Sequence, residues 1–110
     1  MYTDPVQAQL DAYNARDIDA FLSCYARDAV IRHADGRVLL QGHTDIRRRY
    51  QLMFDQNPEL TAQVPTRIRA GRWVVDEEKV HLSEGELHVV VGYEVHEGLI
   101  HSVVMMRSDL

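Results

Sequence analysis

The sequence has a single cysteine, Cys24, so no disulfide can form within the chain, and we expect a protein of a reducing compartment. No apolar run approaches the roughly 20 residues that cross a bilayer. Positive charge is also scarce, with 12 Lys and Arg against 17 Asp and Glu, and the net charge of −5 argues against nucleic-acid binding. The opening residues MYTDPVQAQ have neither the basic nor the apolar region of a signal peptide, so we expect a cytoplasmic protein.

Metal-binding motifs are missing too. The 6 histidines include no H-E-x-x-H sequence and no pair four residues apart on a predicted helix, so we predict no metal site and no cofactor. Cys24 has no neighbouring histidine and is predicted to be a small apolar side chain in a packed helix. The triplet Arg47-Arg48-Arg49 fans around a predicted helix, which is typical of a solvated surface.

The residues that are present suit one globular domain. The 110 residues are 45% apolar and 26% charged, and no linker or repeat divides them, so we predict a single domain over residues 1–110. Two short helices open the chain. Asp4 caps the first, in which Val6, Leu10 and Tyr13 form an apolar stripe, and Asp17 caps the second. The predicted buried face of the second helix consists of Ile18, Phe21, Leu22 and Tyr25.

A hairpin and a third helix follow. A strand opens at residues 29–31, the Asp-Gly pair at 35–36 is a strong turn signal, and a partner strand returns at 38–40. Thr44 is predicted to cap a third helix that stops at the Asn-Pro pair 57–58. The apolar face of this helix consists of Ile46, Tyr50, Met53 and Phe54.

From Leu60 onward the apolar pattern repeats every second residue. Strands are predicted over residues 60–70, 73–82, 87–96 and 99–107, joined by short turns that contain glycine. The order α-α-β-β-α-β-β-β-β predicts an α+β domain, in which a cone-shaped, curved antiparallel sheet wraps around a long helix. Such a cone leaves an apolar cavity open at one end, where small ligands bind in many proteins.

The order of elements and three segments resemble a known superfamily. The segments are NARDIDAFLSCYARDAVI, the helix start GHTDI, and the ending WVVDEE…GYEVHEGLIHSV. Over nearly its whole length the chain is similar to the nuclear-transport-factor-two-like superfamily, and within it to small bacterial proteins like ketosteroid isomerase and the SnoaL-like polyketide cyclases. The resemblance implies the conical fold, a pocket for a small hydrophobic molecule, and either a steroid-isomerase-like isomerase or a polyketide-cyclase-like lyase. The superfamily also contains non-catalytic binders, so the fold does not fix the function.

The positions that carry catalysis in the isomerase are occupied by other residues here. Its carboxylate base works with an oxyanion hole made by a tyrosine and a protonated aspartic acid. The resemblance places the base at His33, the tyrosine near Gln9, and the second acid near Val90, with His88 on the same strand face. A histidine in a partly buried pocket mouth can transfer a proton near neutral pH, so we predict His33 as base or acid. The alternative is a histidine at a strand end that caps a backbone carbonyl. Asp35, two residues on, is another candidate for the base.

Two carboxylates lie on an otherwise apolar strand face. Asp76 and Glu78 share the parity of Val74 and Val80 in the same predicted strand. If they point into the cone, they orient His33 or act as the base, and we predict Asp76 as the catalytic partner of His33. The alternative is a bulged strand edge or a solvated run of charges.

Large apolar side chains are predicted to line the pocket as substrate contacts, together with Gln9, His88 and Val90. Each of them also suits the core, and in a conical fold the two roles overlap. These side chains are Tyr13, Tyr50, Phe54, Trp73 and Met105.

The sheet is expected to have a second apolar face. Val89, Val91, Val104 and Met106 are predicted to lie on the side away from the cavity, so we predict a homodimer through that face. Three functions stay open. They are a cofactor-free isomerase, cyclase or hydratase that moves a proton on a small hydrophobic molecule, a non-catalytic carrier or sensor of such a ligand, and a dimerisation or adaptor module.

Overall fold

The computed structural model describes residues 4–107, over which three helices and six strands follow the predicted order. The helices are α1 (Pro5–Ala15), α2 (Ile18–Leu22) and α3 (Gly42–Gln56). The strands are β1 (Tyr25–His33), β2 (Val38–Gln41), β3 (Thr61–Ala70), β4 (Trp73–Leu82), β5 (Gly85–His96) and β6 (Leu99–Met106). The predicted α+β class is therefore confirmed. None of the described helices has the length and apolar character needed to cross a membrane.

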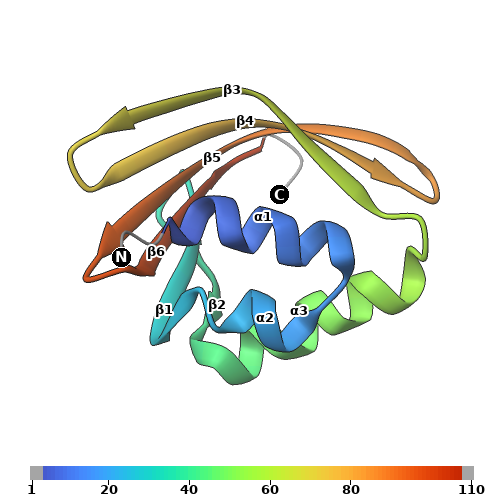
Figure 1. Ribbon diagram of the computed structural model, residues 1–110, viewed down its shortest axis with the longest axis horizontal. Helices are drawn as coiled ribbons and strands as arrows, with labels where there is room; N and C mark the ends of the chain where they lie inside the picture. The colour runs from blue at the N-terminus through green and yellow to red at the C-terminus, as the bar shows by residue number, and fades with distance from the viewer. Residues whose placement is uncertain (1–3, 108–110) are drawn as a thin grey trace.

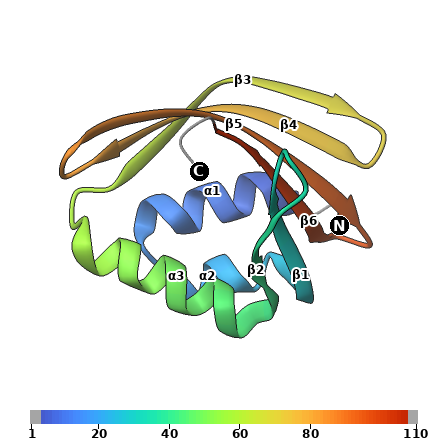
Figure 2. The same ribbon diagram turned by 180° about the vertical axis from the view of Figure 1, so that it is seen from behind.

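The described strands form one curved, open sheet in the order β2-β1-β6-β5-β4-β3. Strands β3 to β6 make the predicted antiparallel meander, and β1 pairs antiparallel with β2. The pairing of β1 with β6 is parallel, so the sheet is mixed rather than purely antiparallel. In Figure 1, β3 to β6 arch over α1, and α2 and α3 lie on the same concave side. Figure 2 shows from behind how the β1–β2 hairpin lies beside β6.

An aromatic cluster joins the three helices to the sheet. Phe21 of α2 packs against Tyr25 of β1 and Tyr50 of α3, with ring centroids 5.0 and 4.7 Å apart. Tyr13 of α1 lies 5.6 Å from Phe54 of α3 in an edge-to-face arrangement. Paired aromatic rings at these separations add stabilisation beyond the burial of their surface. The cluster fixes the distance between the helices and the concave face of the sheet.

The prediction that Tyr25 belongs to the second helix is wrong. Helix α2 stops at Leu22, and Tyr25 is the first residue of β1. The backbone N–H of Ile100 donates to the carbonyl oxygen of Cys24 at 2.9 Å, which starts the parallel pairing of β1 with β6. This partner is far away in sequence, so the local apolar pattern could not show that the strand begins before residue 29.

The predicted cap of the third helix is also wrong. Helix α3 begins at Gly42 rather than after Thr44. Gly42 has a φ of +80°, a conformation that glycine adopts without strain. The carboxylate of Asp45, in the first turn, accepts a hydrogen bond from the backbone N–H of Gln41 at 3.0 Å. This bond satisfies the backbone N–H of the residue that precedes the helix.

The two faces of the sheet differ from the prediction at two positions. Val89 and Val91 lie on the concave face, where they are 5% and 1% exposed, because they pair in register with the inward-pointing Glu78 and Asp76. The prediction that these two valines face outward is wrong. Met106 does lie on the convex face, opposite Val90.

Candidate functional site

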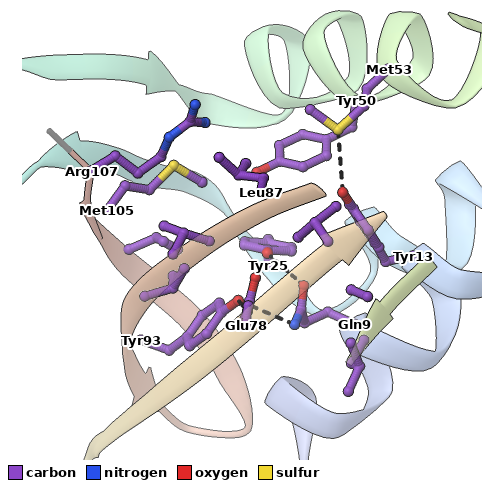
Figure 3. A pocket seen from close by; sticks show the side chains of 16 residues that line it. Gln9, Tyr13, Tyr25, Tyr50, Met53, Glu78, Leu87, Tyr93, Met105 and Arg107 are labelled. Carbon is purple, nitrogen blue, oxygen red and sulfur yellow. Dashed lines mark hydrogen bonds between the residues drawn. The ribbon is translucent and has the colours of Figure 1, made fainter. Parts of the chain in front are cut away.

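A partly enclosed pocket lies on the concave face between the sheet, α1 and α3 (Figure 3). Its cavity volume is about 60 Å³. Its walls are largely apolar, with Val, Leu and Met side chains from β4, β5, β6 and α3. Arg107 lies at its edge, directly after β6. The other polar side chains that line it are Gln9, Tyr13, Tyr25, Tyr50, Glu78 and Tyr93.

Glu78 reaches the pocket because side chains alternate along β4, with Val74 and Val80 on the same face. One of its oxygens, Oε2, accepts a hydrogen bond from the hydroxyl of Tyr93 at 2.8 Å. Within residues 4–107 the other oxygen, Oε1, has no hydrogen-bond or ion-pair partner. The pKa of Glu78 is raised from 4.5 to about 7, chiefly by burial. The hydrogen bond from Tyr93 opposes this rise, and the nearby Asp76 contributes to it. Glu78 can therefore take up and release a proton near neutral pH.

A chain of hydrogen bonds runs from Glu78 back to α1. The Nε2 atom of Gln9 donates to the hydroxyl oxygen of Tyr93 at 3.3 Å and to the carbonyl oxygen of Val6 at 3.1 Å. The Oε1 atom of Gln9 accepts from the hydroxyl of Tyr25 at 3.1 Å. Gln9 is 4% exposed, so the amide is enclosed with these partners rather than with bulk water. The chain ties the carboxylate to α1, β1 and β5.

Two tyrosine hydroxyls on the helix side have different surroundings. Tyr13 donates to the sulfur of Met53 at 3.3 Å, a weak acceptor. The hydroxyl of Tyr50 has no hydrogen-bond partner in the described chain, and Figure 3 shows it directed into the pocket toward Leu87. Burial holds the pKa of the Tyr50 hydroxyl well above its usual value, so this group stays protonated at neutral pH. Tyr50 therefore offers a free hydrogen-bond donor to a ligand.

The pocket continues into a wider depression that shares Met53 and Arg107 with it. Arg49, Glu84 and Glu86 also line this depression. Two arginines and two glutamates thus surround the open end, and their formal charges balance. Within residues 4–107, the charged side chains at the opening therefore favour neither an anionic nor a cationic ligand.

Four of the predicted substrate contacts line the pocket. They are Gln9, Tyr13, Tyr50 and Met105. Phe54 is buried behind them, against Tyr13. The structure brings none of the other three to the pocket, since Trp73, His88 and Val90 lie on the convex face. His88 pairs there with Glu77 at 2.8 Å.

His33 lies at the end of β1 and does not line the pocket. Its Nε2 atom lies 2.5 Å from the carbonyl oxygen of Arg107. Its Nδ1 atom accepts from the backbone N–H of Asp35 at 3.1 Å and lies 3.2 Å from the carboxylate of Asp35. His33 thus holds the backbone of a residue whose side chain reaches the pocket edge. The proton-transfer role predicted for His33 stays a prediction.

Asp76 is fully buried, which contradicts the alternative of a bulged edge or a solvated run of charges. Arg67 of β3 donates to both of its oxygens, from Nε at 2.7 Å and from Nη2 at 2.9 Å. Arg67 also donates to Gln7 of α1 at 2.8 Å. The structure does not pair Asp76 with His33, and Asp76 is not among the residues that line the pocket.

Tyr93 and Tyr25 are site residues that the sequence interpretation missed. The sequence did contain a signal for Tyr93. Side chains alternate along the strand, so Tyr93 shares a face with Val89 and Val91, and this face is the concave one. Tyr25 carried no such signal, since its position depends on the distant pairing of β1 with β6.

Histidines approach each other at the β5–β6 turn, where the rings of His96 and His101 lie 5.5 Å apart. His96 also lies 3.7 Å from the carboxylate of Glu97. In the described part of the chain, no three His, Cys, Asp or Glu side chains are grouped to hold a metal ion.

The fold and the pocket define a small conical domain in which, among residues 4–107, Glu78 is the one acidic side chain that lines the pocket, beside four tyrosines. The family model of the SnoaL-like domain matches residues 6–103, and the chain belongs to this family. A search of curated proteins finds no match. Solved structures of similar fold include an uncharacterised cystatin-fold protein from Novosphingobium aromaticivorans, with a TM-score of 0.87 and 23% identity over 94% of this chain and 95% of that one.

Two further similar structures carry functional names. A candidate polyketide cyclase from Sinorhizobium meliloti has a TM-score of 0.79 and 20% identity over 96% of this chain and 95% of its own. A candidate ketosteroid isomerase from Kribbella flavida has a TM-score of 0.80 and 20% identity over 93% of this chain and 73% of its own. At these identities the likeness establishes the fold alone.

Proposed function

We propose that this protein binds a small hydrophobic molecule in the concave pocket and moves a proton on it without a cofactor, as an isomerase, cyclase or hydratase does. The observation that carries this proposal is Glu78, a carboxyl that lines a largely apolar pocket and has one accessible oxygen without a partner in the described chain. Its pKa of about 7 suits a general base or acid at neutral pH. The names of the two candidate enzymes of similar fold fit this class of reaction.

The pocket supplies the two groups that enolisation of a carbonyl compound needs. Glu78 Oε1 would accept a proton from the carbon next to the carbonyl. The hydroxyl of Tyr50 would donate to the carbonyl oxygen, where negative charge develops as that proton leaves. Both groups face apolar walls, where such interactions are stronger than in water. The proton then returns from Glu78 to another carbon of an isomerised product, or to the same carbon.

The size of the pocket limits the part of a ligand that it can enclose. Its cavity volume of about 60 Å³ is less than half of the roughly 150 Å³ cavity that holds benzene in an engineered protein. We therefore propose that only the reacting end of a ligand lies beside Glu78. The remainder would extend past Met53 and Leu87 toward Arg107 at the open end. A ligand as large as a steroid would require these side chains to move.

Exchange of carbon-bound protons with solvent tests the proposal before a natural substrate is known. Small ketones such as butanone and cyclopentanone are incubated with the protein in D₂O, and the loss of the α-proton signals is followed by NMR. We expect faster exchange with the protein and a fall of about 100-fold in Glu78→Gln. Glu59→Gln, at an exposed turn outside the pocket lining, is the matched control and should keep the full rate.

The same experiment distinguishes an enzyme from a non-catalytic carrier or sensor. Shifts of the Tyr50 and Leu87 signals on addition of a ketone would report binding. Binding without exchange would contradict the enzymatic proposal and favour the carrier or sensor. Neither binding nor exchange across a panel of ketones would contradict ligand binding at this site.

The convex face supports a second proposal, self-association. Four of its large apolar side chains are exposed to solvent in the described chain. They are Ile68, Trp73, Val90 and Met106. Exposed apolar side chains on one face of a sheet mark an interface in many proteins, and such a face suits a two-fold contact between copies. We propose that two copies of the chain associate through this face as a homodimer.

A further inference from the structure

Gln9 is a buried amide on the otherwise apolar inner side of α1, and its orientation is fixed by the backbone. Its Nε2 atom lies 3.1 Å from the carbonyl oxygen of Val6, which can only accept hydrogen bonds. The opposite amide orientation would place Oε1 against that carbonyl, oxygen against oxygen. The nitrogen of Gln9 therefore faces Val6 and Tyr93, and its oxygen faces Tyr25.

This orientation decides where the hydroxyl proton of Tyr93 lies. The hydroxyl oxygen accepts a hydrogen from Nε2 of Gln9, so its own single proton is left for another partner. The acceptor within reach is Oε2 of Glu78, at 2.8 Å. The donor–acceptor direction therefore runs one way, from Gln9 through Tyr93 to Glu78.

A carboxyl oxygen that accepts the Tyr93 proton is a poor place for a second proton. When Glu78 is neutral, its proton must lie on Oε1, which has no partner in residues 4–107. No unpartnered side-chain oxygen of the described residues is buried, so Oε1 is accessible from the pocket that Glu78 lines. We propose that Gln9 is a positioning residue, which through Tyr93 confines the exchangeable proton of Glu78 to the oxygen that a ligand meets. This inference rests on the proposed function for its catalytic meaning, and the Glu78 titration tests it independently.

Other charged and titratable groups around Glu78 do not set this direction. They are Asp76 on β4, Arg67 on β3, Tyr25 on β1, Tyr13 on α1, Tyr50 on α3 and Arg107 directly after β6. Arg67 is engaged by both oxygens of Asp76. None of these groups forms a hydrogen bond with Glu78 in the described chain, so the bond to Tyr93 alone distinguishes its two oxygens.

The test compares Gln9→Met with the wild type in two titrations. Protein labelled with carbon-13 at glutamate carboxyls gives the titration midpoint of Glu78, whose signal is assigned by its absence in Glu78→Gln. The pH profile of ketone exchange gives the midpoint for activity. Without the Gln9 amide, the Tyr93 hydroxyl can rotate and accept a hydrogen bond from the protonated carboxyl of Glu78. The hydrogen bond that Tyr93 donates to the ionised carboxylate also weakens, because no amide N–H polarises the hydroxyl. Both changes favour the neutral form of Glu78. We expect both midpoints to move up by about half a pH unit.

Two comparison variants distinguish the effect of the hydrogen-bond direction set by Gln9 from a general disturbance of side-chain packing. Tyr25→Phe removes a hydroxyl from the far end of the chain but leaves Nε2 of Gln9 held by Val6, so the midpoints should stay unchanged. Gln56→Met makes the same chemical change at an exposed position of α3 and should also leave them unchanged. If Gln9→Met does not fold, Tyr93→Phe serves instead, and its midpoint should rise by about one pH unit or more.

An unchanged carbon-13 midpoint in folded Gln9→Met would overturn the proposal, as would an equal rise in Tyr25→Phe. If the wild type shows no ketone exchange but the carbon-13 midpoint rises as expected, the positioning by Gln9 stands and the proposed function fails. If exchange is present and neither midpoint moves in Gln9→Met, the proposed function stands and the inference about Gln9 fails.

Discussion

Asp76 and Glu78 lie two residues apart on the concave face of β4, yet only Asp76 is paired with a cation. Arg67 lies directly opposite Asp76 on β3 and donates to both of its oxygens. Beside Glu78, the register of β3 slips between Gln63 and Thr66, so β3 presents no paired residue there. The irregularity leaves one carboxylate in a closed ion pair and the other available to a ligand.

The ion pair of Asp76 is expected to be structural. Asp76→Asn would leave the Arg67 guanidinium, 17% exposed, without a charged partner inside the protein. Breaking a buried pair in this way costs about 3 kcal/mol, so the free energy of unfolding measured in urea should fall by that amount. Asp19→Asn removes one partner of an exposed pair with Arg47 and should leave stability nearly unchanged. An equal effect of both substitutions would contradict the structural role.

Glu78 is expected to make the protein less stable as pH rises. The pKa of Glu78 is raised from 4.5 in the unfolded chain to about 7 in the folded one, so between these values only the folded state holds the proton. The free energy of unfolding should therefore fall by about 3 kcal/mol from about pH 5 to about pH 8. Glu78→Gln, which cannot ionise, should remove this fall in urea titrations, whereas Glu59→Gln should keep it. A stability that is flat over this range in the wild type would show that Glu78 titrates normally.

Tyr50 is expected to act on the rate and not on the proton affinity of Glu78. Tyr50→Phe removes the donor to the developing oxyanion, and loss of one such donor lowers turnover by about 100-fold. The midpoint of the pH profile should stay that of the wild type, because Tyr50 forms no hydrogen bond with Glu78 in the described chain. The measurement is ketone exchange over a pH series. A wild-type rate in this variant would exclude Tyr50 as the oxyanion donor.

His33 provides the direct comparison with Glu78. The sequence-based prediction makes it the base or acid, so His33→Ala should then lower exchange as strongly as Glu78→Gln does. The geometry instead ties His33 to the backbone of Arg107, which favours a loss of less than about tenfold with an unchanged pH midpoint. His33→Gln retains a side-chain donor and should recover part of that loss. A loss near 100-fold in both His33 variants would restore the catalytic prediction.

The sequence predicted the fold well because most of its signals are local. Alternation along 73–82 defined β4 with its observed bounds, and glycine turns defined the meander. The parallel β1–β6 pairing and the position of Tyr25 depend on contacts between distant segments, which no local period reports. The two faces of β5 were confused because three consecutive valines, residues 89–91, are apolar on both sides of the strand.

The site was harder to predict than the fold. The alternation of side chains along the strand predicted that Asp76 and Glu78 share one face. Only the register between β3 and β4 shows which of the two carboxylates Arg67 neutralises. Family position pointed to His33, whereas the side chain in this chain turns to the backbone of Arg107. Gln9 was predicted from the family alone, and its polar role depends on Tyr93, a residue 84 positions away.

The convex face gives a prediction about assembly. Met106→Glu would place a charge among exposed apolar side chains next to Val90, and burying that charge in an interface is costly. We expect the wild type to sediment as a dimer and Met106→Glu as a monomer. Leu52→Glu makes a similar change at an exposed position of α3, on the other side of the molecule, and should leave the dimer intact. A wild type that remains monomeric at high concentration would contradict the proposed interface, and a monomer in both variants would place the contact elsewhere.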